Sequence, residues 1–502
     1  MRSPSLLLAV EVLGLVAFLV LCGVQLIDSQ AETTLIPLSA EALTTTDGDE
    51  RWQGVFFQDT HVGFTVTRSS PVTSGGTLYE GRSSFRIATF GQLQEVTTAG
   101  AALTDTDGQL RRFDFFMSAG GVQLIARGEV SGDQIIMEVN QAGEVSTIAF
   151  DIDAPPHVSL SLEEAIRRTE LSVGLSFSVP YFDPVTLSQG EMEIKVEGVE
   201  ILENSEEAYW IRSRMGDIET RSLVTPAGEM LRQEGALGMS LVRMSPEEAT
   251  NISDADEPVD LIALSAVKLT GQIPKARSTR KLTLQITGVE PDRVLHQPPL
   301  QSRQGDRVTV DIPLLLELPE LPVADRSEPE WLTDSPTLPV YHPEIAERAA
   351  AVVSDATTRL EAVKRLNTFV FEYLEKVPVI GVPNGLSVLR SGQGDCNEHT
   401  ALFVSLARAA GIPTRIAAGV VYSSRISPQG AFYYHAWPEV RLEGPTGWVP
   451  VDPTFGQVPA DATHIKLVEG DLDRQVEIMG VMGRLGFVSI EHKKHRDNFG
   501  HT

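Results

Sequence analysis

The stretch Gly394-Asp395-Cys396-Asn397-Glu398-His399 decides the fold of the C-terminal part of this chain. The apolar run that follows it, Ala401–Ala407, predicts a helix with Cys396 in its first turn. The only other cysteine, Cys22, lies in an apolar N-terminal segment. A thiol at the N-terminus of a helix is placed where a thiolate is stabilised. Cys396 is therefore either a reactive thiol or a small buried apolar residue, and the neighbouring sequence bears on the choice.

Helical and strand patterns surround this stretch. Upstream, His342-Pro343 predicts the start of one helix, and Leu360–Tyr373 has the apolar spacing of a second, amphipathic helix. Downstream, residues 414–422, 431–442 and 448–451 are predicted to be strands. This order of elements indicates an α+β domain over residues 341–490.

Two of the predicted strands carry what a nucleophilic thiol needs, a base and a group that orients it. Alternation places His435 and Trp437 on one face of the first strand, and Asp452 follows the second. A hairpin that brings His435 opposite Asp452 needs a bulge or a slip of a residue or two. Taken alone, His435 is explained as a packed histidine and Asp452 as a turn residue before Pro453. The order cysteine, histidine, aspartate favours a catalytic site.

Four motifs together resemble the transglutaminase-like superfamily of papain-fold thiol enzymes, and the resemblance covers roughly residues 340–470. They are Gly394–His399, Ala410-Gly411-Ile412-Pro413-Thr414-Arg415, His435-Ala436-Trp437-Pro438-Glu439-Val440 and Trp448-Val449-Pro450-Val451-Asp452-Pro453-Thr454. The resemblance implies Cys396 as nucleophile, His435 as general base and then acid, and Asp452 as the orienting acid. It also implies acyl transfer from an amide through a thioester.

Three further residues are candidates for supporting roles. Gln393 is a possible oxyanion donor, His399 lies on the same helix face as the thiol, and Trp437 is expected to shape the cleft. Asp395 would raise the pKa of the thiol unless its carboxylate points elsewhere. The histidines lack the spacing of a metal site, so no metal and no cofactor are expected.

Residues 51–318 have the pattern of an antiparallel β-rich region. Short alternating segments are separated by turn signals such as Asp107-Gly108 and Gly132-Asp133, which predicts a meander. Two subdomains with a break near 244–260 are possible within it. Residues 31–50 are predicted to be a linker, residues 319–340 a proline-rich interdomain linker, and residues 491–502 a disordered tail.

The first 30 residues are predicted to be a signal anchor or transmembrane helix. Ser5–Ile27 carries a single charge, Glu11, and about 20 apolar residues span a bilayer. Arg2 before this segment, with Asp28 and Glu32 after it, indicates a single-pass protein of the cell membrane with its body on the extracytoplasmic, periplasmic side. The alternative is a protein secreted after signal cleavage beyond Ser29–Ala31.

The formal net charge of −27 argues against nucleic acid as a partner. The sequence therefore predicts a membrane-anchored, transglutaminase-like cysteine enzyme that acts on amide bonds of a protein or peptide substrate. A cysteine peptidase or amidase of the same fold is one alternative. A non-catalytic binding or scaffold protein of the cell envelope is the other. The sequence does not identify further protein partners.

Overall fold

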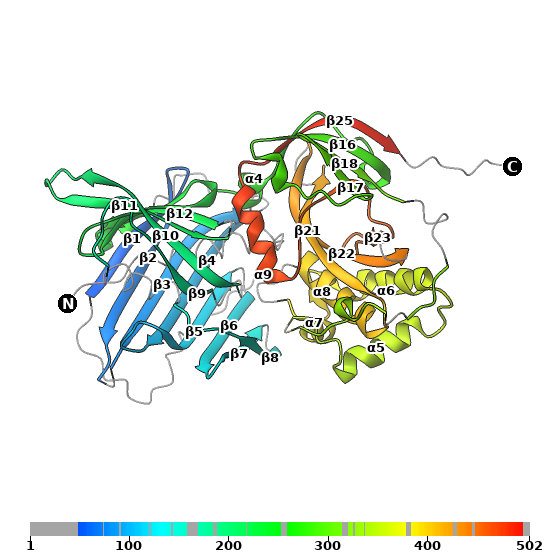
Figure 1. Cartoon of the computed structure of the whole chain (residues 1–502), viewed down its shortest axis with the longest axis horizontal. Coiled ribbons are helices and arrows are strands. Elements are labelled where there is room, and N and C mark those ends of the chain that lie inside the picture. Colours follow the sequence, from blue (N-terminus) through cyan, green and yellow to red (C-terminus); the bar gives the residue numbers. More distant parts are fainter. Residues whose placement is uncertain are drawn as a thin grey trace. The chain divides into compact units, whose positions relative to one another are not determined.

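The computed structural model describes residues 49–494, except 74, 90–91, 120–121, 142–143, 158–168, 184–187, 217, 253–258, 314–319, 325–326, 336, 378–382, 425–428 and 444–446. The described residues fall into two compact units, one that ends at Leu264 and one that begins at Ser265. Each unit is described by itself, and Figure 1 labels the elements of both. The predicted anchor, most of the predicted linker and residues 495–502 lie outside the described residues. Among the described residues, no helix is both long and apolar enough to cross a membrane.

The first unit is built on one antiparallel sheet of 14 strands, in the order β8-β7-β6-β5-β4-β3-β2-β1-β14-β13-β12-β11-β10-β9. This confirms the predicted antiparallel β-rich region. The strands are β1 Asp49–Phe57, β2 Thr60–Pro71, β3 Thr77–Thr89, β4 Gln92–Thr104, β5 Leu110–Ala119, β6 Val122–Ser131, β7 Gln134–Gln141, β8 Glu144–Asp151, β9 Ser176–Asp183, β10 Ser188–Ile201, β11 Glu207–Met215, β12 Ile218–Val224, β13 Met230–Glu234 and β14 Met239–Met244.

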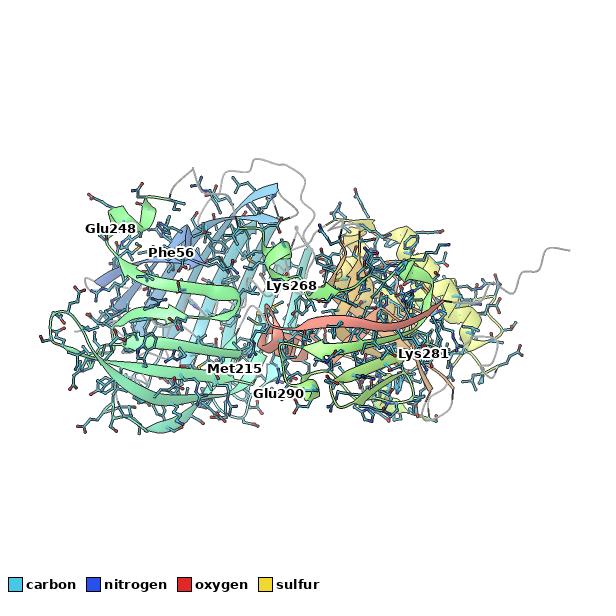
Figure 2. All side chains as sticks on the ribbon, turned by 90° about the horizontal axis from the view of Figure 1, so that it is seen from above. Phe56, Met215, Glu248, Lys268, Lys281 and Glu290 are labelled. Atoms are coloured by element: carbon cyan, nitrogen blue, oxygen red, sulfur yellow. The ribbon has the colours of Figure 1, made fainter. Side chains whose placement is uncertain are left out.

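Local turn chemistry and one distant pairing produce this strand order. Gly132, with φ +66°, makes the tight turn between β6 and β7, a backbone conformation that glycine adopts without strain. Such turns connect neighbours into two meanders, β1–β8 and β9–β14. The meanders are joined where β1 pairs with β14, from Trp52 opposite Met244 to Phe57 opposite Met239. Figure 2 shows the side chains that project from both faces of these strands.

The second unit contains a four-stranded antiparallel sheet in the order β23-β22-β21-β24. Its strands are β21 Thr414–Ser423, β22 Ala431–Glu443, β23 Gly447–Pro450 and β24 His464–Glu469. The helices of this unit are α5 Pro343–Val353, α6 Arg359–Tyr373, α7 Gly385–Ser391, α8 Cys396–Ala409 and α9 Leu472–Gln475. Two short strands, β19 Glu375–Lys376 and β20 Gln393–Gly394, pair in parallel before α8.

Side-chain caps fix where these helices begin. Thr358 accepts from the N–H of Glu361 at the start of α6, and Asn384 accepts from the N–H groups of Leu386 and Ser387 at the start of α7. Such caps satisfy amide groups that have no intrahelical acceptor. After α8, Gly411 has φ +78°, so the predicted glycine stop is where the helix ends.

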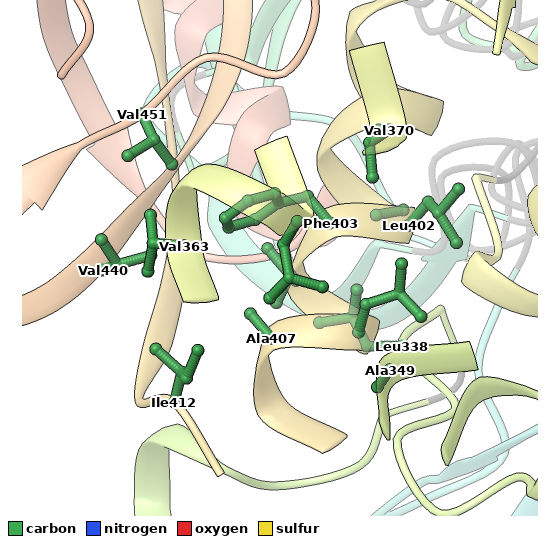
Figure 3. Close-up of a cluster of buried hydrophobic side chains, with 14 of the residues drawn as sticks. Leu338, Ala349, Val363, Val370, Leu402, Phe403, Ala407, Ile412, Val440 and Val451 are labelled. Atoms are coloured by element: carbon green, nitrogen blue, oxygen red, sulfur yellow. The ribbon is translucent and has the colours of Figure 1, made fainter. Parts of the chain in front are cut away.

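A single hydrophobic cluster packs α5, α6, α7 and α8 against the four-stranded sheet. Figure 3 shows part of it, with Phe403 and Leu402 of α8 among side chains of α5, α6 and the strands. Phe403 is completely buried, as are Val363 of α6 and Val440 of β22. Burying side chains of this size stabilises by roughly 1.5–3 kcal/mol each. The cluster therefore holds the N-terminal end of α8 in a fixed position relative to β22.

A five-stranded sheet, in the order β15-β25-β16-β18-β17, completes the second unit. Its strands are β15 Lys268–Thr270, β16 Thr279–Thr287, β17 Gln301–Gln304, β18 Arg307–Asp311 and β25 Gly486–Lys494. Lys281 of β16, labelled in Figure 2, donates a 2.7 Å hydrogen bond to Asp311 of β18. We call this sheet the accessory sheet.

The second unit corrects three predicted boundaries, two of them through the accessory sheet. Residues 265–311 belong with the C-terminal unit and not with the β-rich region, because β16 pairs along its length with β25 near the C-terminus. Strand β25 also extends to Lys494, past the predicted start of a disordered tail at 491. The described part of 319–340 is bound to the same unit, since Leu321 O and Thr337 O accept from the N–H groups of Arg359 and Gly385.

The close approach of β24 to β21 leads to a first prediction. A Cβ atom at Gly419 would lie 2.1 Å from Ile465 O and 2.9 Å from Leu467 N, which are backbone atoms that cannot rotate away. Gly419→Ala is therefore expected to destabilise the C-terminal unit by about 2 kcal/mol, a typical cost of overpacking. Chemical denaturation followed by tryptophan fluorescence measures this. Gly198→Ala, where nothing lies within 4 Å, is the matched control and should leave the unfolding midpoint unchanged.

Candidate active site

Cys396 is the first residue of α8, and its thiol is buried, with a residue exposure of 6%. The helix begins with a capping box in which Asp395 accepts from the N–H of Asn397 and Glu398 accepts from the N–H of Asp395. Burial raises the pKa of the Cys396 thiol well above its ordinary value, and the nearby Asp395 adds to the rise. At neutral pH the resting group is a thiol, so it needs a base to become a nucleophile.

The first turn of α8 is attached to β22 at Ala436. Thr400 Oγ1 donates a 3.1 Å hydrogen bond to Ala436 O, and the thiol of Cys396 makes a hydrogen bond with the backbone of the same residue. Residues four apart lie on one face of a helix, so both side chains reach the strand together. The thiol thus lies beside the residue that follows His435.

His435 and Asp452 are hydrogen-bonded as the sequence predicts. His435 Nε2 lies 2.9 Å from Asp452 Oδ2, and Asp452 has no exposed surface. The second carboxylate oxygen, Oδ1, accepts from the N–H groups of Thr454 and Phe455 at 2.7 and 2.9 Å. The bond to Asp452 assigns the proton of a neutral His435 ring to Nε2, which leaves Nδ1 as the basic nitrogen.

The strand pairing differs from the one expected for this contact. Pro450 lies opposite Glu439, with a bulge between Arg441 and Glu443, so Asp452 is not directly opposite His435. Strand β23 ends at Pro450, and Asp452 instead pairs with Gln457 across a short turn. The carboxylate reaches the imidazole diagonally from this turn, where two backbone N–H groups hold it.

A second histidine, His464, binds the same carboxylate and was not found by sequence analysis. His464 Nε2 lies 3.0 Å from Asp452 Oδ2, and Nδ1 lies 2.9 Å from Asp461 O. Burial lowers the pKa of His464, but the bonds to Asp452 and Asp461 outweigh burial and raise it to about 9. His464 is therefore an imidazolium at neutral pH. The only local signal is an aspartate turn, in which Asp461 Oδ1 accepts from the N–H of Thr463 at 2.9 Å just before β24.

The electrostatic environment keeps His435 neutral. Burial is the largest cause of its lowered pKa; the Asp452 carboxylate opposes this, and the positive charges of His464 and Arg277 add to it. Asp452 itself is ionised, because its contacts with the two histidines outweigh the effect of burial and lower the pKa of its carboxyl group. The site thus holds a neutral base and a neutral thiol, and an Asp452–His464 ion pair lies next to the base.

The carboxyl group of Asp395 lies close to a second carboxyl group, that of Glu398. Burial raises the pKa of Asp395 well above its ordinary value, and the neighbouring carboxyl of Glu398 adds to the rise. Two buried carboxyl groups this close cannot both ionise. The expected effect of Asp395 on Cys396 is present, because after burial the charge of Asp395 is the largest cause that raises the pKa of the thiol.

The three supporting candidates lie in different environments. Gln393 Nε2 donates to Glu375 at 3.2 Å on the exposed side of the β19–β20 pair. The ring of His399 is fully buried; its Nδ1 lies 2.6 Å from Asp395 O, and burial lowers its pKa to about 4. Trp437 is buried with its ring centroid 6.1 Å from that of His435 and 5.1 Å from that of His464. Of the three, Trp437 has ring contacts with both histidines.

Within the part of the chain that the structure describes, one group of side chains could hold a metal ion. The ligand atoms of His435, Asp452 and His464 all lie within 4.8 Å of one another. Both histidines direct Nε2 at the same oxygen, Asp452 Oδ2, so hydrogen bonds account for the cluster. An ion at this position would have to displace both Nε2 protons.

Comparison with known families agrees with this arrangement. Residues 346–453 match the family model Transglut_core, described as the transglutaminase-like superfamily. The C-terminal domain is transglutaminase-like. The matched residues include Cys396, His435 and Asp452, whereas Arg277, Asp461 and His464 lie outside them. No curated protein matches the sequence.

Several solved structures share partial similarity with the chain. A beta-barrel-like protein of unknown function from Brucella abortus is 9% identical, with a TM-score of 0.32 over 39% of this chain and 94% of that one. A candidate cysteine protease from Cytophaga hutchinsonii is 15% identical, with a TM-score of 0.28 over 43% of this chain and 87% of that one. A candidate protease from Parabacteroides distasonis is 10% identical, with a TM-score of 0.20 over 69% of each chain.

Proposed function

We propose that the transglutaminase-like domain is a thiol enzyme that transfers or hydrolyses acyl groups of protein or peptide amides. Cys396 is the nucleophile, His435 the general base and acid, and Asp452 the group that orients His435. One observation carries the proposal, namely the buried 2.9 Å hydrogen bond between His435 and Asp452. The residue after His435 on the same strand, Ala436, binds the thiol of Cys396 through its backbone.

In the first half of the proposed reaction, His435 Nδ1 takes the thiol proton as the sulfur of Cys396 bonds to the amide carbonyl carbon. The oxyanion forms near the N-terminus of α8, whose dipole stabilises negative charge. When the C–N bond breaks, His435 returns the proton to the departing amine and a thioester remains. Water or a second amine then attacks the thioester, and His435 again accepts its proton. The bond between the acyl carbon and the Cys396 sulfur breaks, the acid or new amide leaves, and His435 returns the proton to the sulfur.

Two other functions rest on the same fold. A cysteine peptidase or amidase differs only in admitting water to the thioester. A non-catalytic binding or scaffold protein would not need the His435–Asp452 bond, and the proton assignment imposed by that bond favours an enzyme. We further propose that Ser5–Ile27 anchors the protein in the cell membrane with the domain on the extracytoplasmic side, on the strength of its apolar sequence.

The pH dependence of Cys396 alkylation tests the proposal. In the wild-type chain the rate should rise with pH through the pKa of His435, because only the neutral ring accepts the thiol proton. Burial lowers that pKa, so the rise should be complete below the pH expected for a free histidine. In His435→Ala the rate at pH 7 should fall by about 100-fold. Labelling should then require alkaline pH, because burial raises the pKa of the thiol.

Iodoacetamide is the reagent, and mass spectrometry of the Cys396 peptide separates its labelling from that of Cys22. His342→Ala is the control, since this histidine caps α5 and should leave the rate unchanged. If His435→Ala labels at the wild-type rate near neutral pH, the thiol is an inert buried cysteine. Amine incorporation compared with peptide release then separates transferase from hydrolase activity.

A further inference from the structure

Three residues outside the family-matched region connect to the proposed base. Arg277 belongs to a 3-10 helix, Ala276–Ser278, that precedes β16 of the accessory sheet. Its Nη1 lies 2.8 Å from Asp461 Oδ2, and its Nη2 donates to Tyr422 O. His464 Nδ1 lies 2.9 Å from the backbone Asp461 O and 3.8 Å from the carboxylate oxygen Asp461 Oδ1, and His464 Nε2 binds Asp452. A chain of alternating charge therefore runs from Arg277 to the carboxylate that orients His435.

The ring of Phe455 provides a second connection between Arg277 and His435. The ring of Phe455 stacks on His435, with centroids 5.0 Å apart and an interplanar angle of 14°. The Arg277 guanidinium lies 4.5 Å from the centroid of that ring. A cation over an aromatic face is attracted to it. Arg277 thus reaches His435 by two routes, through the two aspartates and through Phe455.

The backbone supports this closed arrangement. The N–H of Ala462 donates to Thr279 O at 2.8 Å, which attaches the accessory sheet to the segment between Asp461 and His464. Asp461 is 3% exposed at its side chain, whereas Arg277 is 39% exposed and lies at the outer end of the arrangement. The inner groups are thus shielded from water. Charge pairs interact more strongly in such a buried environment than in water.

We propose that His464 and Arg277 are positioning residues for His435. This inference rests on the proposed thiol chemistry. His464 donates a second hydrogen bond to Asp452 Oδ2, the oxygen that accepts from His435, and Arg277 contacts Asp461 and Phe455. The charged and titratable groups that face His464 are Asp452, Asp461 and His435, with Arg277 beyond Asp461. The positive charges of His464 and Arg277 also disfavour protonation of His435, so they extend the pH range in which the base is neutral.

The test compares full-length variants by the pH profile of Cys396 alkylation with iodoacetamide. In His464→Gln and Arg277→Met, loss of a positive charge should move the midpoint of the rise to higher pH, and the plateau rate should fall by about 10-fold. In Arg277→Lys the charge is kept, so the midpoint should return to the wild-type value while the plateau recovers only partly. If a residue were needed only for folding, the pH midpoint of alkylation would not depend on whether its replacement keeps the positive charge.

Arg280→Met is the matched control, because Arg280 lies on the same segment and contacts Asp311 instead. It should show the wild-type profile. If His464→Gln fails to fold, the two variants of the half-exposed Arg277 decide. Wild-type profiles for Arg277→Met and His464→Gln, with slow labelling of His435→Ala, would overturn this inference and leave the proposed function intact. Equal labelling of wild type and His435→Ala would overturn both.

Discussion

Replacing Asp452 with asparagine is expected to slow alkylation of Cys396 by at least about 100-fold at pH 7. Asp452 Oδ2 accepts from both His435 and His464, and an amide NH2 placed there would meet two N–H donors. Turning the amide offers one oxygen to the histidines but directs its NH2 group at the backbone N–H groups of Thr454 and Phe455. The turned orientation is disfavoured by these two donors, and in the other orientation His435 loses the acceptor that keeps its proton on Nε2, so Nδ1 no longer serves as the base.

The same substitution is expected to destabilise the domain by about 3 kcal/mol, since it leaves a buried His464 imidazolium without its carboxylate. The effect has a defined pH dependence. The pKa of His464 in the folded state is raised to about 9, so its contribution is fully present below the unfolded value near 6.5 and is lost as pH rises through 9. Asp452→Asn should flatten the decline in wild-type stability over this range.

Denaturant unfolding at pH 6, 8 and 10 measures the stability effect, and iodoacetamide labelling measures the rate. Asp355→Asn is the control, because the Asp355 side chain is 83% exposed and its contact with Arg365 is long, at 3.7 Å. It should change neither quantity. An Asp452→Asn protein that labels at the wild-type rate would contradict the orienting role of the carboxylate.

Local signals made the thiol side of the site predictable. The run after Cys396 has helical periodicity, Asp395 and Glu398 have the spacing of a capping box, and Gly411-Ile412-Pro413 ends the helix. Each of these signals acts within a few residues, so a sequence displays it directly. The same holds for the tight turns of the N-terminal sheet.

The outer part of the site depends on contacts that no local pattern displays. Arg277 and Asp461 are 184 residues apart, and β16 pairs with β25 across a comparable separation. The proline-rich segment before α5 has the composition of a linker, yet its backbone binds Arg359 and Gly385. His464 carries no motif of its own, and its role becomes visible only when β24 is placed beside β21.

A second large effect is expected from Glu439→Ala, on the same strand, β22, as His435. Glu439 is buried and directly opposite Arg415 in the register of β21 and β22. Its Oε2 accepts from Arg415 Nε at 2.8 Å and from Lys466 Nζ at 2.7 Å. Removing the carboxylate leaves two buried cations sharing the partly exposed Glu469. Breaking a buried pair in this way destabilises by about 3–5 kcal/mol.

The cause of that loss can be separated from a simple loss of packing. Because the penalty comes from unpaired cations, the double variant Glu439→Ala/Lys466→Met should regain part of the stability that Glu439→Ala loses. Trp448 reports on this region, since the Arg415 guanidinium lies 4.1 Å from its ring centroid. Glu344→Gln removes an exposed pair with Arg390 and should leave the fluorescence-detected midpoint unchanged. If the double variant is no more stable than Glu439→Ala alone, Glu439 stabilises the sheet by side-chain packing and not by pairing with the two cations.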